Sequence, residues 1–187
     1  MAELDYNKYF YLNLSARTDW VSNTFVKSIT YPAASISFIP TEAFDNITST
    51  NGLNFLKLRP SNGTSAGFAD SYPVSNNLDL TARDFSDANG VVNPALQSSS
   101  RLGNANLKPE LLSEFEFGFD SKFFDNRIGL NASYFLRNTK NLITETPIDP
   151  STGFSSTFTN IGELRGNGIE VDLDLHLVKN SNNGFNW

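Results

Sequence analysis

The chain has 187 residues, of which 39% are hydrophobic, 18% charged and 13% aromatic. Fourteen Lys and Arg against twenty Asp and Glu give a formal net charge of −6, which argues against a nucleic-acid partner because nucleic-acid binding needs a basic face. The absence of cysteine excludes disulfide scaffolds and thiolate metal sites, and the single histidine, His176, excludes histidine-rich metal sites. We therefore expect neither a metal ion nor a cofactor.

No run of apolar residues approaches the roughly 18 that a transmembrane helix requires, so a helical membrane protein is excluded. A membrane β-barrel stays compatible with the same composition, because its strands alternate between polar lumen-facing and apolar lipid-facing residues.

Alternation of apolar and polar residues predicts three strands in the first half of the chain, at residues 9–18, 33–39 and 53–59. The only helical turn expected lies near residues 41–44. The alternation is less regular here than in the second half.

The second half begins with a strand at residues 113–123 that carries phenylalanine on one face and carboxylates on the other. A short turn around residues 125–127 leads into a strand at 128–137, which predicts a β-hairpin. A further strand is predicted at 169–177, and residues 185–187 look like the start of another. The chain thus contains about six predicted strands and a stub.

The predicted connections alternate between long and short. Long polar loops are expected at 19–32, 60–109 and 138–165, and short ones lie between them. A loop of about 50 residues is far outside the usual range for compact domains. Long loops at one end and short turns at the other are typical of outer-membrane barrels, with the short turns in the periplasm.

The predicted fold is therefore all-β: an antiparallel up-and-down meander that forms part of a transmembrane β-barrel. Strands of about 9 to 11 residues suit a tilted crossing of the bilayer. Single-chain barrels start at about eight strands, so six strands and a stub predict a piece of a larger barrel. The alternative is a soluble β-sandwich that binds a ligand or serves in adhesion, since alternation alone does not separate the two.

Several short motifs, in order along the chain, resemble those of one family. They lie at residues 31–37 (YPAASIS), 56–63 (LKLRPSNG), 103–110 (GNANLKPE), 116–119 (EFGF), 134–135 (YF), 138–143 (NTKNLI) and 160–170 (NIGELRGNGIE). Together they resemble a late barrel segment of the SusC/RagA branch of TonB-dependent receptors, which is common in Bacteroidetes. Two departures are Ala105, where the family usually has proline, and Pro60, which we expect to mark the end of strand pairing.

The resemblance implies a segment of an outer-membrane transporter that imports glycan or peptide nutrients in Gram-negative bacteria. It also implies a SusD-like surface lipoprotein as a partner, TonB as a partner through regions that this chain does not contain, and contact with outer-membrane lipid. Residues 1–187 would form one fragment of the barrel domain, with no enzymatic activity.

The carboxylates of the strands could form a catalytic pair or a calcium site, but a hydrated wall is the more economical interpretation. In that interpretation they form cross-strand pairs with Lys57, Arg59, Arg137 and Arg165. No catalytic residue is predicted. Aromatic residues of the long loops are candidates for contact with a ligand or a lid protein, with ordinary loop packing as the alternative: Phe68, Tyr72, Phe154 and Phe158.

Overall fold

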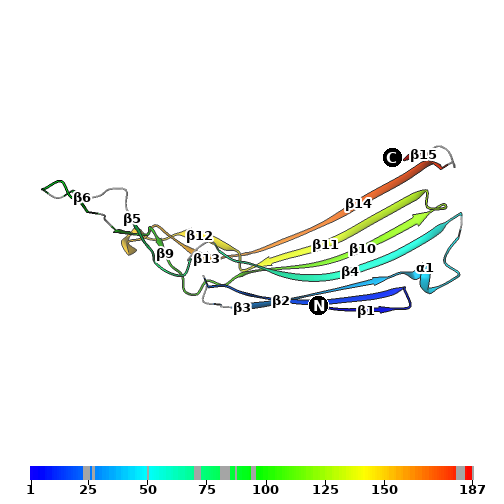
Figure 1. The fold of residues 1–187 in the computed structure, drawn as a ribbon, viewed down its shortest axis with the longest axis horizontal. Helices are drawn as coiled ribbons and strands as arrows, with labels where there is room; N and C mark the ends of the chain where they lie inside the picture. Colours follow the sequence, from blue (N-terminus) through cyan, green and yellow to red (C-terminus); the bar gives the residue numbers. More distant parts are fainter. Residues whose placement is uncertain are drawn as a thin grey trace.

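The computed structural model describes residues 1–22, 26, 28–49, 51–69, 73–80, 85–86, 88–93, 96–179 and 184–186. Its main element is an antiparallel sheet of eight strands in the order β1-β2-β3-β4-β10-β11-β14-β15 (Figure 1). The strands are β1 (Ala2–Tyr6), β2 (Phe10–Trp20), β3 (Ser28–Phe38), β4 (Leu53–Gly67), β10 (Glu110–Phe123), β11 (Ile128–Lys140), β14 (Glu163–Lys179) and β15 (Gly184–Asn186). Each strand pairs with the next along the sheet, so the predicted meander is confirmed.

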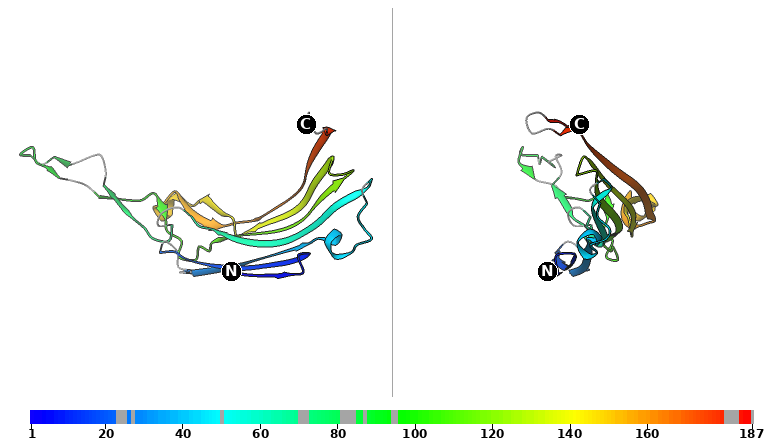
Figure 2. Two further views of the ribbon diagram at one scale, coloured as in Figure 1. Left: turned by 45° about the vertical axis from the view of Figure 1, so that its right-hand side comes forward. Right: turned by 90° about the vertical axis from the view of Figure 1, so that its right-hand side faces the viewer.

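The connections divide the sheet into two ends. At one, which we call the turn end, lie the β1–β2 turn, the helical turn α1 (Pro40–Ala43) and the β10–β11 turn. The other, the loop end, carries the β4–β10 and β11–β14 connections, which extend well beyond the sheet (Figure 1). The views in Figure 2 show that the long strands bend together into a curved sheet.

The loop end contains short elements of its own. They are β5 (Leu78–Leu80), β6 (Phe85–Ser86), β7 (Val92–Asn93), β8 (Leu96–Ser98), β9 (Arg101–Leu102), β12 (Ile143–Pro147), the 3-10 turn η1 (Pro150–Thr152) and β13 (Ser156–Asn160). β12 and β13 form an antiparallel hairpin, and β9 lies parallel to β13. β5 pairs with β8 and β6 with β7 in an arm that projects away from the sheet (Figure 1).

The hairpin of β10 and β11 closely follows the sequence prediction. Its ladder is continuous from Phe123 opposite Ile128 to Leu111 opposite Lys140. The intervening turn places Phe124, Asp125 and Asn126 at φ values of 53°, 56° and 57°. Asn and Asp tolerate this left-handed region better than most residues, which explains why the chain reverses here.

The strands are longer than the sequence predicted. β2 and β3 extend into the predicted loop 19–32, and β11 and β14 extend into the predicted loop 138–165. β14 begins at Glu163 rather than at residue 169, since β11 holds residues 163–168 in register despite their glycines. β1 was not predicted at all, whereas the helical turn at α1 was.

Pro60 does not end strand pairing, contrary to the sequence prediction. β4 continues to Gly67, and Pro60 itself lies opposite Phe117 in an unbroken ladder with β10. The β3–β4 ladder, in contrast, pairs Phe38 with Leu58 and Ser35 with Ser61 but skips the two residues between. The missing N–H of Pro60 therefore faces β3, where the ladder is interrupted, and the loop predicted at 60–109 starts only after Gly67.

The described residues of the sheet enclose no apolar core. Among the described residues the buried hydrophobic core consists of Leu107 alone, which lies at the loop end and not between two sheets. The accessible surface is 12992 Å², whereas a compact soluble monomer of 20.7 kDa would expose about 8,900 Å². This surface contradicts the soluble β-sandwich alternative, because a sandwich buries one face of each sheet against the other.

Within the described part of the chain, no helix has the length and apolar composition needed to cross a membrane.

Candidate functional site

The two faces of the sheet differ sharply in chemistry, because side chains alternate along every strand. The register places one set of large apolar side chains on a common face, which we call the apolar face. Its members are between 36% and 73% exposed and include Leu4, Leu14, Ile36, Phe115, Phe117, Tyr134, Leu136, Ile169, Val171 and Leu173. The opposite side, the polar face, carries Arg17, Asp19, Arg59, Glu114, Glu116, Asp120, Arg137, Glu170, Asp172 and Asp174.

Cross-strand ion pairs cover part of the polar face, as predicted for two of the four cations. Arg59 on β4 lies 2.9 Å from Asp120 on β10, measured from Nε to Oδ2, and donates to the side-chain oxygen of Asn131 on β11 at 3.2 Å. Arg137 on β11 pairs with Glu114 on β10. Half-exposed ion pairs of this kind contribute about 0–1 kcal/mol each to folding stability. Their main effect is to fix the positions of side chains on the polar face.

Arg165 does not join this wall, contrary to the prediction. It is an odd-numbered residue of β14 and so shares the apolar face with Ile169 and Leu173. Its Nη2 lies 3.1 Å from Oε2 of Glu163, two residues earlier on the same strand. The prediction placed Arg165 at the end of the loop 138–165, so its position in the alternation of β14 was not predicted.

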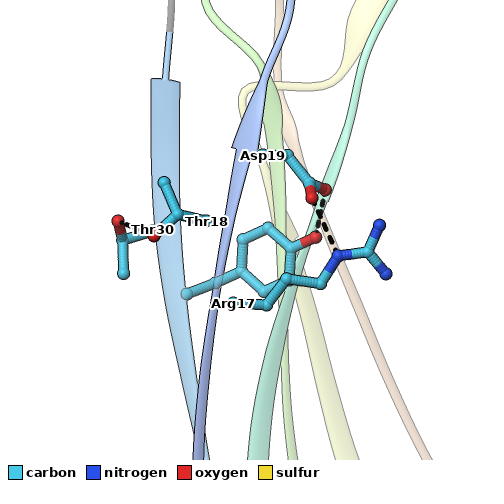
Figure 3. A network of polar contacts seen from close by, with 5 residues as sticks. Arg17, Thr18, Asp19 and Thr30 are labelled. Atoms are coloured by element: carbon cyan, nitrogen blue, oxygen red, sulfur yellow. Dashed lines mark hydrogen bonds and ion pairs between the residues drawn. The ribbon is translucent and has the colours of Figure 1, made fainter.

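Figure 3 shows the same alternation at the loop end of β2 and β3. Arg17 and Asp19 lie on one side of the strand pair, with Arg17 Nε 2.8 Å from Asp19 Oδ1, and Tyr31 donates to the second oxygen of Asp19. Thr18 and Thr30 lie on the other side, and their hydroxyls are 2.8 Å apart. The polar face therefore keeps organised hydrogen bonds up to the loop end.

Two of the four aromatic ligand candidates come together at the base of the loops. Phe68, just after β4, and Phe158, on β13, line one cavity of about 190 Å³ together with Ala69, Glu110 and Ile143. Its walls thus combine two aromatic rings with one carboxylate.

The cavity is held in place by its own hydrogen bonds. Glu110 Oε1 accepts from the Ile143 N–H at 2.7 Å, which ties β10 to the β12–β13 hairpin. The Arg101 guanidinium lies 4.5 Å above the ring of Phe158, a distance typical of a cation–π contact. Glu110, Arg101 and Ile143 were not predicted as site residues, although Glu110 ends the motif at 103–110 and could have been found there.

The segment that leads into β10 is fastened to the β12–β13 hairpin. Asn160 on β13 accepts from the Lys108 N–H and donates to the Lys108 carbonyl, both at 2.8 Å. Asn104 donates to the carbonyl of Phe158 at 2.8 Å. Leu107, between these two contacts, is 1% exposed. Side-chain hydrogen bonds thus fasten the base of the loops around a buried leucine.

The other two candidates do not reach this cavity. Phe154 lies at the tip of the β12–β13 hairpin, where its N–H donates to Thr152 Oγ1 at 3.4 Å. Tyr72 lies outside the residues that the structure describes. Across the described ranges, no group of three carboxylate or imidazole side chains could hold a metal ion.

The family model for the TonB dependent receptor-like β-barrel matches residues 1–187. The chain belongs to this family. The predicted resemblance is thereby confirmed, and the chain is a segment of an outer-membrane protein.

The curated relatives are also TonB-dependent receptors. TonB-dependent receptor P26 of Formosa agariphila is 30% identical over 190 residues, which cover 97% of this chain and 18% of that protein. TonB-dependent receptor P39 of the same organism is 26% identical over 193 residues, or 98% of this chain and 17% of that protein. The chain therefore spans less than a fifth of the length of the relatives it matches.

Solved structures show the same fold. The RagAB peptide importer in its closed-closed state superimposes with a TM-score of 0.78, at 21% identity, over 96% of this chain and 19% of that chain. The siderophore receptor PirA from Pseudomonas aeruginosa superimposes with a TM-score of 0.60, at 16% identity, over 96% of this chain and 30% of that chain. At these identities the likeness concerns the fold.

Proposed function

We propose that this chain forms part of the wall and the extracellular loops of a TonB-dependent transporter that imports glycan or peptide fragments. One observation carries the proposal: a curved single sheet with an exposed apolar face, an ion-paired polar face and no core between them. Such a sheet suits a barrel wall with lipid outside and a hydrated lumen inside. In this arrangement the turn end lies in the periplasm and the loop end outside the cell.

The relatives support the substrate class. One neighbour in fold, RagAB, is a peptide importer, and the curated relatives are TonB-dependent receptors. We propose that a SusD-like surface lipoprotein covers the loop end and that TonB engages a region outside residues 1–187. The segment itself carries out no catalysis in this proposal.

The cavity at the loop base is the proposed point of substrate contact. Aromatic rings stack on sugar rings and on apolar peptide side chains, and Glu110 can accept a hydrogen bond from a hydroxyl or amide group. Phe68 and Phe158 are therefore the proposed contact residues, with Tyr72 and Phe154 as further candidates from the sequence.

The proposal is tested in the full-length transporter by uptake of labelled oligosaccharides and labelled oligopeptides. Phe68→Ser and Phe158→Ser should each raise the substrate concentration needed for half-maximal uptake, whereas Phe124→Ser, at the turn end, should leave it unchanged. Uptake should disappear in cells that lack TonB. Equal effects of all three substitutions would reject the cavity as the contact site, and uptake without TonB would reject the transporter class.

A further inference from the structure

Toward the loop end, polar residues interrupt the apolar face on three neighbouring strands. On β10 it runs from Phe123 to Phe115, nine residues that correspond to about 27 Å of strand, or about 20 Å of height after a tilt of 35–45°. The next residues on this face are Ser113, Asn138 and Arg165, which are successive cross-strand partners on β10, β11 and β14. This row therefore lies where the hydrocarbon of a membrane gives way to its headgroups.

A surface cavity of about 410 Å³ lies at this boundary. Five of its lining residues belong to the apolar face by their register: Ser113, Leu136, Asn138, Arg165 and Asn167. Arg137 and Gly166, which also line it, belong to the polar face. We call it the rim site. Leu136 is the last large apolar side chain below it, and Leu111, Lys140 and Glu163 form the next row above it.

Two polar groups of the rim site are not satisfied by the described part of the protein. The Asn138 side-chain oxygen is buried and accepts no hydrogen bond there. Of the Arg165 guanidinium, only Nη2 is engaged by a described residue, so Nε and Nη1 are left for a further acceptor.

This combination calls for a ligand with an anion and a hydroxyl group close together. A guanidinium binds phosphate oxygens through two parallel hydrogen bonds, and a buried carbonyl oxygen needs a donor such as a sugar hydroxyl. Arg165 and Lys140 together outweigh the charge of Glu163 on this face. The neighbouring Tyr134 and Leu136, 38% and 45% exposed, offer an apolar track that leads away from the site toward the membrane interior.

We propose that the rim site binds the phosphorylated sugar headgroup of an outer-leaflet glycolipid, with the acyl chains lying over Tyr134 and Leu136. Arg165 holds the phosphate, and the Asn138 side chain turns outward so that its oxygen accepts a hydrogen bond from a sugar hydroxyl. The proposal rests on the membrane orientation given under the proposed function but concerns the outer surface of the wall rather than the transported substrate.

The test uses the full-length protein, purified in neutral detergent and titrated with lipid A, a phosphorylated glucosamine glycolipid, while native mass spectrometry counts the bound lipid. Arg165→Gln should weaken binding about tenfold, as expected for the loss of charge-assisted hydrogen bonds. Arg17→Gln is the matched control, because Arg17 also pairs with a carboxylate two residues away but lies on the polar face. It should leave lipid binding unchanged.

Further arms separate the alternatives. Arg165→Lys should retain more binding than Arg165→Gln, and Asn138→Leu should weaken it in a barrel that still migrates as folded on an unheated gel. Equal binding by Arg165→Gln and Arg17→Gln would overturn the proposal. So would inorganic phosphate displacing the lipid at equal concentration, or phosphatidylglycerol binding as well as lipid A. A spin label at position 173 that is accessible to a water-soluble quencher would instead reject the membrane orientation itself.

Discussion

At Gly168 the polar face has room for little more than a hydrogen atom, because a methyl group there would lie 2.6 Å from Cζ of Phe135. We expect Gly168→Ala to destabilise the folded barrel by about 1–3 kcal/mol through overpacking. Gly166→Ala is the matched control, since nothing lies within 4 Å of the corresponding methyl group. Urea unfolding followed by tryptophan fluorescence measures both, and Phe135→Ala should rescue Gly168→Ala. A neutral Gly168→Ala would contradict the close contact.

Asp149 begins the 3-10 turn at the tip of the β12–β13 hairpin, and its Oδ1 accepts from the Ser151 N–H at 2.8 Å. This backbone hydrogen bond holds the pKa of the Asp149 carboxyl below its usual value. Its contribution to local stability is therefore complete above the unfolded pKa, near 4, and is lost as the pH falls through the lower folded value.

Amide hydrogen exchange of the hairpin tip in the full-length protein measures this dependence. Exchange at Ser151, corrected for the intrinsic rate, should stay constant from neutral pH to about 4 and should rise only in stronger acid. Asp149→Asn keeps an acceptor but does not titrate, so it should remove the acid dependence. An acid transition that persists in Asp149→Asn would assign it to another group.

The candidate site shows which residue-level features a sequence reveals. Phe68 and Phe158 were selected as loop aromatics, but nothing in the sequence indicates that they line one cavity while Phe154 does not. That depends on the register of β13 against β12 and on the parallel contact with β9, which join residues far apart in the chain. The outward direction of Arg165 depends in the same way on the pairing of residues 163–168 with β11, which the sequence does not show.

Among the elements, β4 offers a direct test of how a proline fits inside a sheet. Pro60→Ala should change stability by less than about 1 kcal/mol, because position 60 contributes no donor to the intact β10 ladder. Ser61→Pro should cost about 1–3 kcal/mol, since it removes a donor from that ladder and leaves an acceptor unpaired. The unfolding midpoints of the two variants measure these changes in stability. A large loss of stability in Pro60→Ala would show that the Pro60 nitrogen does not face β3.

Element boundaries were predicted best where the strand carries a complete local signal. β10 and β11 combine regular alternation with a recognisable turn, so their positions were found within a few residues. β1 has only five residues. The first residues of β14 include two glycines and an asparagine, a composition typical of loops. In both cases the partner strand imposes the extended conformation, and a single sequence does not display its partner.

For the molecule as a whole, the orientation of the wall can be tested on β14. Leu173 is on the apolar face and 52% exposed, and Asp172 and Asp174 lie on the polar face. A spin label at 173 should be quenched by a lipid-soluble agent, and labels at 172 and 174 by a water-soluble one. The same response at all three positions would reject a membrane-spanning strand.

Stability should show the same asymmetry. Leu173→Arg places a cation in hydrocarbon and should cost about 2–4 kcal/mol near the midplane. Asp172→Asn alters only a hydrated wall and should cost about 0–1 kcal/mol. Both values can be measured by reversible unfolding of the full-length protein in micelles.

Expressed alone, residues 1–187 should not be a well-behaved soluble monomer. Phe115 and Phe117 are 42% and 43% exposed and lie in a continuous apolar surface. We expect the isolated chain to require detergent or to self-associate and to bind a dye that reports exposed apolar surface. A monodisperse monomer in plain buffer without dye binding would contradict this expectation.

The central pairing of the sheet joins two halves across the longest connection. β4 and β10 are separated by residues 68–109, a segment of 42 residues, whereas β10 and β11 are joined by four. The free-energy cost of closing a loop rises by about 0.6 kcal/mol for each doubling of its length. Closing the β4–β10 connection therefore costs about 2 kcal/mol more than closing the β10–β11 turn. We expect the order of strand pairing to follow from this difference. β1–β4 and β10–β14 form as separate units, and the barrel wall becomes continuous only when β4 pairs with β10.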